Sequence, residues 1–357
     1  MPRLADHRRA TTGRYARALC LMLSVCAIPL FAFTRPAHAE PSTVRVALVQ
    51  AASDAPFFIA EKKGYFAQED IRVDFLILRD MIASLGTGQL DVGGTSTSAG
   101  LFNAVARGID IKIVSDKGST PLGYDYQPIL VRKDLVTSGK VKGFEDLNGL
   151  NIAAFNKGSA SMSTLNEALA KVRLKLSDVN VVYMPFPQHV LALQNRAVDA
   201  SITTEPSATE AISSGAAVRL SAADIYPDHQ LAVVLYSGDF VKKNPEVARK
   251  FMRAYIRGAR DYNDALKDGK LAGLRADEVI AILTQYTAIK NPEIFRKMTP
   301  NGVDPNGRLN MASLRKDLQF YRDQGLIVGT VSVEQAVDNS FVEAAVKDLG
   351  SYVRMSK

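Results

Sequence analysis

The sequence is poor in side chains for thiol and metal chemistry. It has two cysteines, Cys20 and Cys26, and four histidines in 357 residues. Both cysteines precede residue 40, so a chain cleaved after Ala39 would have no disulfide, thiol nucleophile or thiolate metal site. The two later histidines, His189 and His229, are not spaced as metal ligands, and no Ser-His-Asp order or G-x-S-x-G elbow is present. We therefore expect a protein that is not an enzyme and that carries no metal and no cofactor.

The first 39 residues have the pattern of an export signal rather than of a fold. An arginine-rich start precedes the apolar stretch Ala18–Phe33, which is too short for a comfortable membrane span. Ala37-His38-Ala39 then gives the small-x-small pattern that signal peptidase reads. This predicts a secretory signal cleaved before Glu40 and a periplasmic protein; the alternatives are an uncleaved anchor and a lipoprotein.

The basic charge of the chain belongs mainly to this leader. The leader holds six of the 44 Lys and Arg residues and one of the 37 Asp and Glu residues, so the formal charge of +7 falls to +2 without it. Such a balance gives no indication of nucleic-acid or membrane binding. The remaining chain is long enough to bury a core and to form two lobes.

Two segments of the chain repeat one another. Ala83–Asp91 (ASLGTGQLD) returns 108 positions later as Leu191–Asp199 (LALQNRAVD), and the residues after both aspartates stay in register. Each copy has the pattern of a helix, a turn, a buried strand and a second helix, the unit of a parallel α/β sheet. Two such units predict two similar lobes with a ligand cleft between them. The alternative is that any two βα units look alike at this level.

Strand and helix patterns divide the rest of the chain. We expect residues 43–128 and 237–349 to form one discontinuous lobe and residues 129–236 to be inserted as the second. From Asn244 the pattern is one helix after another, giving a helical C-terminal region. The expected strands are Val44–Val49, Ile71–Leu78, Ile109–Val114, Tyr124–Arg132, Leu147–Phe155, Val179–Met184 and Leu231–Tyr236. The expected helices include Met162–Lys171, Ala276–Tyr286, Met311–Gln324 and Val333–Leu349.

Candidate ligand-binding residues follow the expected strands, because ligands of parallel α/β sheets bind at the carboxyl ends of strands, near helix N-termini. Short hydroxyl and glycine residues gather there, which suits a polar or anionic ligand. The alternative is ordinary helix capping, and for Arg79 a rim charge paired with Asp80. The candidates are Gln50, Phe57, Arg79, Thr95, Ser96, Ser115, Asp116, Gly158, Ser159, Gln188, His189 and Glu205.

Several motifs together resemble one family. They are the Gly64-Tyr65-Phe66 turn, the Leu-x(4)-[LV]-Asp pattern in both repeats, Gly158-Ser159 at a helix start and Glu205-Pro206. From Val44 to about Asp264 the chain resembles the periplasmic solute-binding proteins of the nitrate/sulfonate/taurine and thiamine-pyrimidine-precursor ABC importers.

The resemblance implies a type II periplasmic binding protein fold, in which two α/β lobes close on a small organic, anionic solute such as a sulfonate or carboxylate. It also implies a monomer that delivers its ligand to a membrane permease and its ATPase subunit. By position, the pocket would include Gln50, Phe57, Thr95, Ser96, Ser115, Gly158, Ser159, Gln188 and Glu205. Members often have glycines where Arg79-Asp80 stands, so this loop indicates an unusual specificity.

Two other functions stay open at this stage. One is a secreted enzyme on the same scaffold, similar to the pyrimidine synthase, although the cysteine-rich site of that enzyme is absent. It would need a lysine near the cleft for a Schiff base, with Lys62, Lys117 and Lys157 as candidates. The other is a ligand sensor that docks on a membrane receptor.

Overall fold

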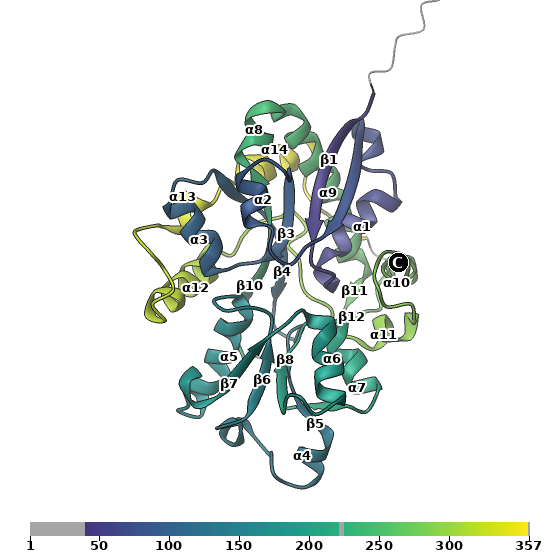
Figure 1. Ribbon diagram of the computed structural model, residues 1–357. Helices are drawn as coiled ribbons and strands as arrows, with labels where there is room; N and C mark the ends of the chain where they lie inside the picture. Colours follow the sequence, from purple (N-terminus) through teal and green to yellow (C-terminus); the bar gives the residue numbers. More distant parts are fainter. Residues whose placement is uncertain (1–39, 221–224, 356–357) are drawn as a thin grey trace, which may run out of the picture. The chain divides into compact units, whose positions relative to one another are not determined.

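The computed structural model describes residues 40–220 and 225–355, and the predicted signal peptide lies outside these ranges. Two five-stranded sheets form the framework (Figure 1). The first has the order β2 (Ile71–Ile77), β1 (Ser42–Leu48), β3 (Val92–Ser96), β10 (His229–Ser237) and β4 (Ile111–Thr120). The second has the order β7 (Asn180–Tyr183), β6 (Asn151–Ala154), β8 (Ala200–Ile202), β5 (Ile129–Arg132) and β9 (Ala217–Arg219).

Both sheets are built in the same way, which confirms the two α/β lobes and the predicted fold. In each, three parallel strands come first and the fourth strand runs antiparallel. That fourth strand is a crossing strand in both cases: β5 carries the chain into the second sheet and β10 carries it back to the first. All nine residues of β10 are buried, as expected of a strand covered on both faces.

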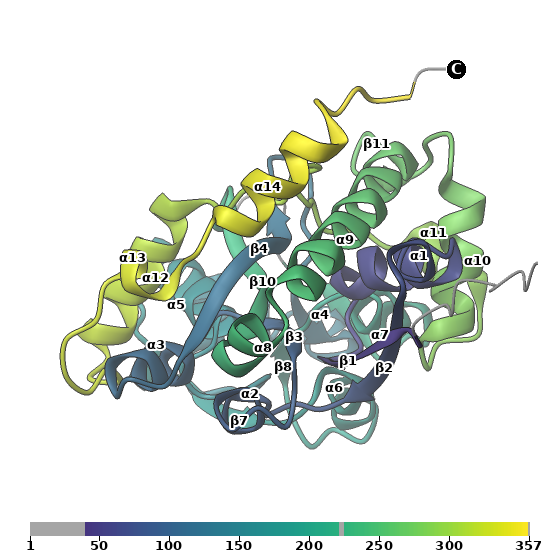
Figure 2. The same cartoon turned by 90° about the horizontal axis from the view of Figure 1, so that it is seen from above.

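Helices cover the sheets, and several of the later ones cross the first sheet (Figure 2). Those before the second sheet are α1 (Ala55–Lys62), α2 (Ile82–Gly86) and α3 (Ala99–Ala106). Within the second sheet's segment come α4 (Lys133–Thr137), α5 (Ala160–Lys171), α6 (Phe186–Gln194) and α7 (Ser207–Ser213). The rest are α8 (Gly238–Lys243), α9 (Pro245–Ala265), α10 (Ala276–Tyr286), α11 (Pro292–Lys297), α12 (Met311–Asp323), α13 (Val333–Ala336) and α14 (Ser340–Leu349), with a small hairpin of β11 (Leu266–Lys267) and β12 (Lys270–Leu271). None of these helices is long and apolar enough to cross a membrane.

The 21-residue helix α9 anchors the first sheet's core. It begins after Asn244 with Pro245 at its first position, where proline loses no hydrogen bond. Its buried face packs on α1 and α14. The approach of α1 requires a glycine at position 258, because a Cβ there would collide with the carbonyl oxygen of Pro56.

We call residues 40–128 and 229–355 the first lobe and residues 129–220 the second lobe. The predicted second lobe extends to residue 236. In the structure, however, β10 begins at His229 and pairs with β3 and β4 of the first sheet, so residues 229–236 belong to the first lobe. The predicted strand ending at Val114 instead continues to Thr120, because β10 pairs with it along its length. The predicted helix Val333–Leu349 is two helices, α13 and α14. With these corrections, the division into domains stays a prediction.

Candidate functional site

The two lobes meet through backbone hydrogen bonds at the carboxyl ends of their strands. The Ala99 N–H of the first lobe donates to the Gly158 carbonyl of the second at 2.8 Å, and the Ala160 N–H donates to the Thr97 carbonyl at 3.0 Å. Beside them, the Ala52 N–H donates to the Glu205 carbonyl at 3.0 Å. The openings after β1 and β3 therefore lie against the openings after β6 and β8, in a closed arrangement.

A small cavity of about 20 Å³ lies between these openings, and we call it the central cavity. It has room for about one water molecule. Gln127 is buried in its wall; its Nε2 donates to Ser161 Oγ at 2.8 Å, while its Oε1 has no partner within the described residues. Both lobes line this cavity. The lining residues are Val49, Ala51, Ser53, Ser96, Lys117, Tyr126, Gln127, Phe186, Thr204, Leu231 and Ala232.

A buried ion pair forms one wall of the central cavity. Lys117 Nζ lies 2.6 Å from Asp54 Oδ1, and both side chains are fully buried. The ammonium also donates to Ser53 Oγ at 2.8 Å, and Asp54 Oδ2 accepts the Ala51 N–H at 3.0 Å. Gly94 leaves room for the lysine stem, since a Cβ there would lie 2.9 Å from Lys117 Cε. Because the two charges neutralise each other, the central cavity offers an uncharged lining to a ligand.

Some predicted site residues lie in this region and others do not. Ser96 lines the central cavity, and Ser159 forms an isolated β-bridge with Ser98 across the lobes. Gln50 lines a separate opening of about 290 Å³ beside α6, and Gln188 is exposed. Thr95, Ser96 and Arg79 line a larger cavity, which is described below.

Three predicted site residues belong to the interior instead. Phe57 is fully buried in the first lobe's core, its ring centroid 4.7 Å from that of Tyr255, because α1 turns this side chain toward α9. Ser115 and Asp116 lie within β4 rather than after it. The Ser115 hydroxyl donates to the Gly307 carbonyl at 3.2 Å, and Asp116 accepts the Asp304 N–H at 2.6 Å. Burial raises the pKa of Asp116 to about 7, although the hydrogen bond from the Asp304 N–H acts in the opposite direction.

Glu205 and His189 support local structure in the second lobe. The Glu205 carboxylate accepts the Thr209 N–H at 2.8 Å at the start of α7 and pairs with Arg219 at 3.2 Å, while burial raises its pKa. His189 Nδ1 lies 2.8 Å from Thr203 Oγ1, and its Nε2 lies 3.1 Å from the Met184 carbonyl oxygen. These contacts match the capping alternative rather than direct ligand contact.

The buried imidazole of His189 makes stability depend on pH. Burial lowers its pKa to about 4, so the folded protein binds fewer protons than the unfolded chain between about pH 4 and 6.5. The neutral imidazole therefore contributes up to about 3 kcal/mol to the free energy of unfolding. This stabilisation is complete above the pKa of the unfolded chain and is lost as pH falls toward 4. In His189→Gln we expect the difference from wild type in free energy of unfolding to grow with pH across this window. Urea titrations at pH 4.5, 5.5 and 6.5 measure it, and parallel curves would contradict the assignment.

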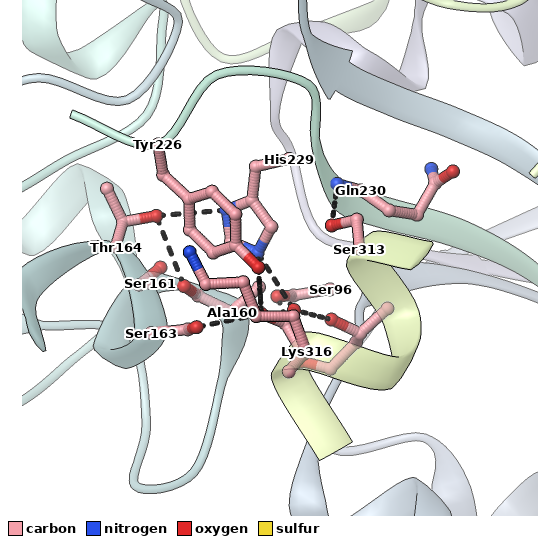
Figure 3. Close-up of polar contacts among 12 residues, drawn as sticks. Ser96, Ala160, Ser161, Ser163, Thr164, Tyr226, His229, Gln230, Ser313 and Lys316 are labelled. Atoms are coloured by element: carbon pink, nitrogen blue, oxygen red, sulfur yellow. Dashed lines mark hydrogen bonds and ion pairs between the residues drawn. The ribbon is translucent and has the colours of Figure 1, made fainter. Parts of the chain in front are cut away.

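A second polar cluster joins the lobes around the buried carboxylate of Asp317 on α12. Figure 3 shows other members of this cluster, among them Ser163, Tyr226 and His229. This carboxylate accepts Ser163 Oγ–H of α5 at 2.7 Å and lies 2.8 Å from His229 Nε2. The Tyr226 ring stacks on the imidazole of His229 with centroids 3.9 Å apart. The cluster thus ties β10 and α12 of the first lobe to α5 of the second. His229 and Asp317 lie 88 positions apart, so no local pattern in the sequence predicts their contact.

Thr164, His229 and Asp317 form a hydroxyl–imidazole–carboxylate chain like that of a catalytic triad, but the hydroxyl is buried. Thr164 Oγ1 lies 3.1 Å from His229 Nδ1, but it also lies 3.3 Å from the Ala160 carbonyl of its own helix. All three side chains are buried. The cluster therefore connects helices rather than presenting a nucleophile. Within the described ranges, no group of three or more His, Asp or Glu side chains could hold a metal ion.

Known proteins resemble this chain in sequence and in fold. The riboflavin-binding protein RibY of Chloroflexus aurantiacus is 24% identical over 347 residues, which are 91% of this chain and 95% of RibY. The alkanesulfonate-binding protein SsuA of Xanthomonas axonopodis pv. citri, bound to MOPS, superposes with a TM-score of 0.68 at 21% identity, covering 85% of this chain and all of SsuA. The desulfurization enzyme DSZB superposes with a TM-score of 0.59 at 16% identity, covering 87% of this chain and 100% of DSZB.

The family assignment comes from the segment that contains both repeats. Residues 52–266 match the family described as NMT1/THI5 like, and this segment includes both sheets' crossing strands and the backbone hydrogen bonds between the lobes described above. The chain belongs to the NMT1/THI5-like family.

Proposed function

We propose that this chain is the extracytoplasmic solute-binding component of an ABC import system and takes a small organic anion between its lobes. The observation that carries the proposal is the central cavity, where both lobes contribute polar groups and the Gln127 Oε1 is buried without a partner among the described residues. A buried acceptor without a partner costs free energy that a ligand donor would recover. Closure then depends on ligand, because the closed state alone satisfies the donors and acceptors of both lobes.

The lining of the central cavity favours an uncharged part of the ligand there. Lys117 is neutralised by Asp54, and Phe186 stacks on Phe155 with centroids 4.7 Å apart. With a volume of about 20 Å³, the central cavity takes only a small uncharged group of the ligand, such as a hydroxyl that donates to Gln127 Oε1. The names of the relatives, a riboflavin-binding and an alkanesulfonate-binding protein, support an organic ligand and leave its identity open.

The enzyme alternative is supported only by the similarity of the fold to the desulfurization enzyme DSZB, and none of its candidate lysines suits a Schiff base. A Schiff base needs an unprotonated lysine amine, but Lys117 is held by Asp54 and Ser53. Lys62 is exposed at the far end of α1, and Lys157 is exposed in the loop before α5. We expect no imine absorbance band when pyridoxal phosphate is added to the purified protein.

Export and delivery belong to the same proposal. One of the structural neighbours is the periplasmic aliphatic sulphonate binding protein SsuA from Escherichia coli. A secreted chain cleaved before Glu40 would begin two residues before β1. Intact-mass measurement of exported protein should give a chain starting at Glu40; a retained leader or a lipid on Cys26 would contradict it. The partners are a permease and its ATPase subunit, with a membrane sensor as the alternative receiver.

A thermal-shift panel tests the proposal directly. MOPS, taurine, 1-hexanesulfonate, benzoate, nitrate and riboflavin are added to the purified protein, and at least one should raise the melting temperature. A ligand at a hundred times its Kd stabilises the folded state by about 2.7 kcal/mol. Gln127→Met keeps the side-chain size and removes the unpartnered acceptor, so the shift should shrink. A panel without any shift, or an imine band, would overturn the proposal.

A further inference from the structure

A second, larger cavity opens beside the central one. Its volume is about 470 Å³, within the range of about 300–1,000 Å³ typical of ligand pockets. Residues of both lobes line it, from the loop after β2 and the ends of β3 and α3 on one side to Asn156 and Lys157 on the other. Ser96 lines both this cavity and the central one. We call the larger one the basic cavity.

Positive charge predominates in this wall. Arg79, Arg107 and Lys157 line the basic cavity, against one carboxylate, Asp80. Arg107 and Lys157 form no ion pair within the described part of the chain, and they come from different lobes. Arg79 lies 3.3 Å from Asp80, but both are exposed, and such a pair contributes little. A cleft lined by one sign of charge attracts an oppositely charged group and holds it most strongly when closed.

The neutral side chains of the basic cavity suit a ligand that is charged only at one end. Met81, Ile82 and Ile109 give an apolar surface, and Thr95 and Ser96 give hydroxyls at its inner end. Asn156 Oδ1 is buried in the same wall without a partner among the described residues, which points to a ligand donor at this position as well. Guanidinium groups bind tetrahedral oxyanions through two parallel N–H donors.

We propose that the basic cavity binds a phosphate monoester, with its dianionic phosphate near Arg107 and Lys157 and its uncharged part against the apolar surface of the same cavity. This inference rests on the proposed solute-binding function and specifies the substrate class. A net excess of two positive charges in the lining matches a dianion, whereas a sulfonate or a single carboxylate brings only one negative charge. Arg107 and Lys157 line the same cavity from different lobes, so one group can attract both.

The test compares pairs of ligands that share an uncharged part and differ in the end group and its charge. At pH 8, hexyl phosphate is a dianion and 1-hexanesulfonate a monoanion; riboflavin 5′-phosphate and riboflavin form a second pair. We expect the phosphate of each pair to bind roughly tenfold or more tightly by calorimetry, as one or two charge-assisted hydrogen bonds would give. The double variant Arg107→Gln/Lys157→Gln should lose this preference. Lys62→Gln/Lys140→Gln, which also removes one exposed cation from each lobe, should keep it.

The outcomes separate the inference from the function on which it rests. Equal affinity for phosphate and sulfonate, or a preference that survives in the Arg107→Gln/Lys157→Gln variant, overturns the dianion site and leaves solute binding in place. Binding of none of the four probes by the wild-type protein, together with an unresponsive thermal-shift panel, overturns both.

Discussion

Asp54→Asn and Lys117→Met, each made alone, are expected to lower the free energy of unfolding by about 3–5 kcal/mol. Each variant leaves one fully buried group without its counter-charge, and an uncompensated buried charge is strongly destabilising. For a chain of this size such a loss corresponds to a fall in melting temperature of about 5–15 °C. Urea unfolding with linear extrapolation, supported by thermal melts, measures the loss.

The double variant distinguishes the ion pair from the two separate side chains. Asp54→Asn/Lys117→Met removes both charges, so it should cost less than the sum of the single variants by at least about 2 kcal/mol. Additive losses would show that the pair contributes no coupling. Asp54→Asn also places an unpaired ammonium in the central cavity, and we expect this variant to bind small anions such as nitrate more tightly than wild type does.

The arrangement of the two lobes could be predicted from the sequence because it depends on a local pattern repeated twice. Ala83–Asp91 precedes β3 and Leu191–Asp199 precedes β8. These two strands have equivalent positions in two sheets of equivalent strand order. Both terminal aspartates also have the same role. Asp91 accepts the backbone N–H of Arg45 at 2.8 Å, and Asp199 accepts that of Asn151 at 3.0 Å, each at the neighbouring strand. Both aspartates therefore hold the ends of strands.

The site was predicted only in part because strand ends are hard to place from sequence. Thr95, Ser96, Gly158 and Ser159 were expected at the carboxyl ends of strands and do lie at the contact between lobes. Ser115 and Asp116 were assigned by the same rule, but β4 continues past them because β10 pairs along it. A strand's length is decided by its partner, and β10 is more than a hundred positions away in the sequence.

The ion pair of Lys117 with Asp54 and the burial of Gln127 had no local signal in the sequence. Lys117 lies in the middle of a strand, and its partner Asp54 is at the start of a helix far away in the sequence. A lysine in a strand is more often exposed, so only the fold could show that this one is fully buried. Gln127 lies in the segment that crosses between the lobes, where the sequence predicts extension but no direction for the side chain. Both are residues whose role depends on contacts between distant parts of the chain.

Gly158→Leu is expected to reduce ligand affinity by about tenfold to a thousandfold. Gly158 has φ +69°, its carbonyl accepts the Ala99 N–H, and a Cβ would lie 3.0 Å from Ala99 Cβ and 3.1 Å from Leu326 Cδ1. A leucine side chain would therefore hold the second lobe away from the first and cost the closed state one or two hydrogen bonds. Calorimetry with the tightest-binding solute of the thermal-shift panel measures the effect.

A second glycine of the same lobe separates this steric effect from backbone strain. Gly149 has φ +73°, but a Cβ there would meet no atom within 4 Å. Gly149→Leu and Gly158→Leu should both lose about 1–2 kcal/mol of stability, because an L side chain disfavours positive φ. Only Gly158→Leu should also lose affinity, since only Gly158 lies at the contact with Ala99. If both variants bind ligand like wild type, the loop before α5 has no part in closure, and the backbone hydrogen bonds between the lobes do not depend on ligand.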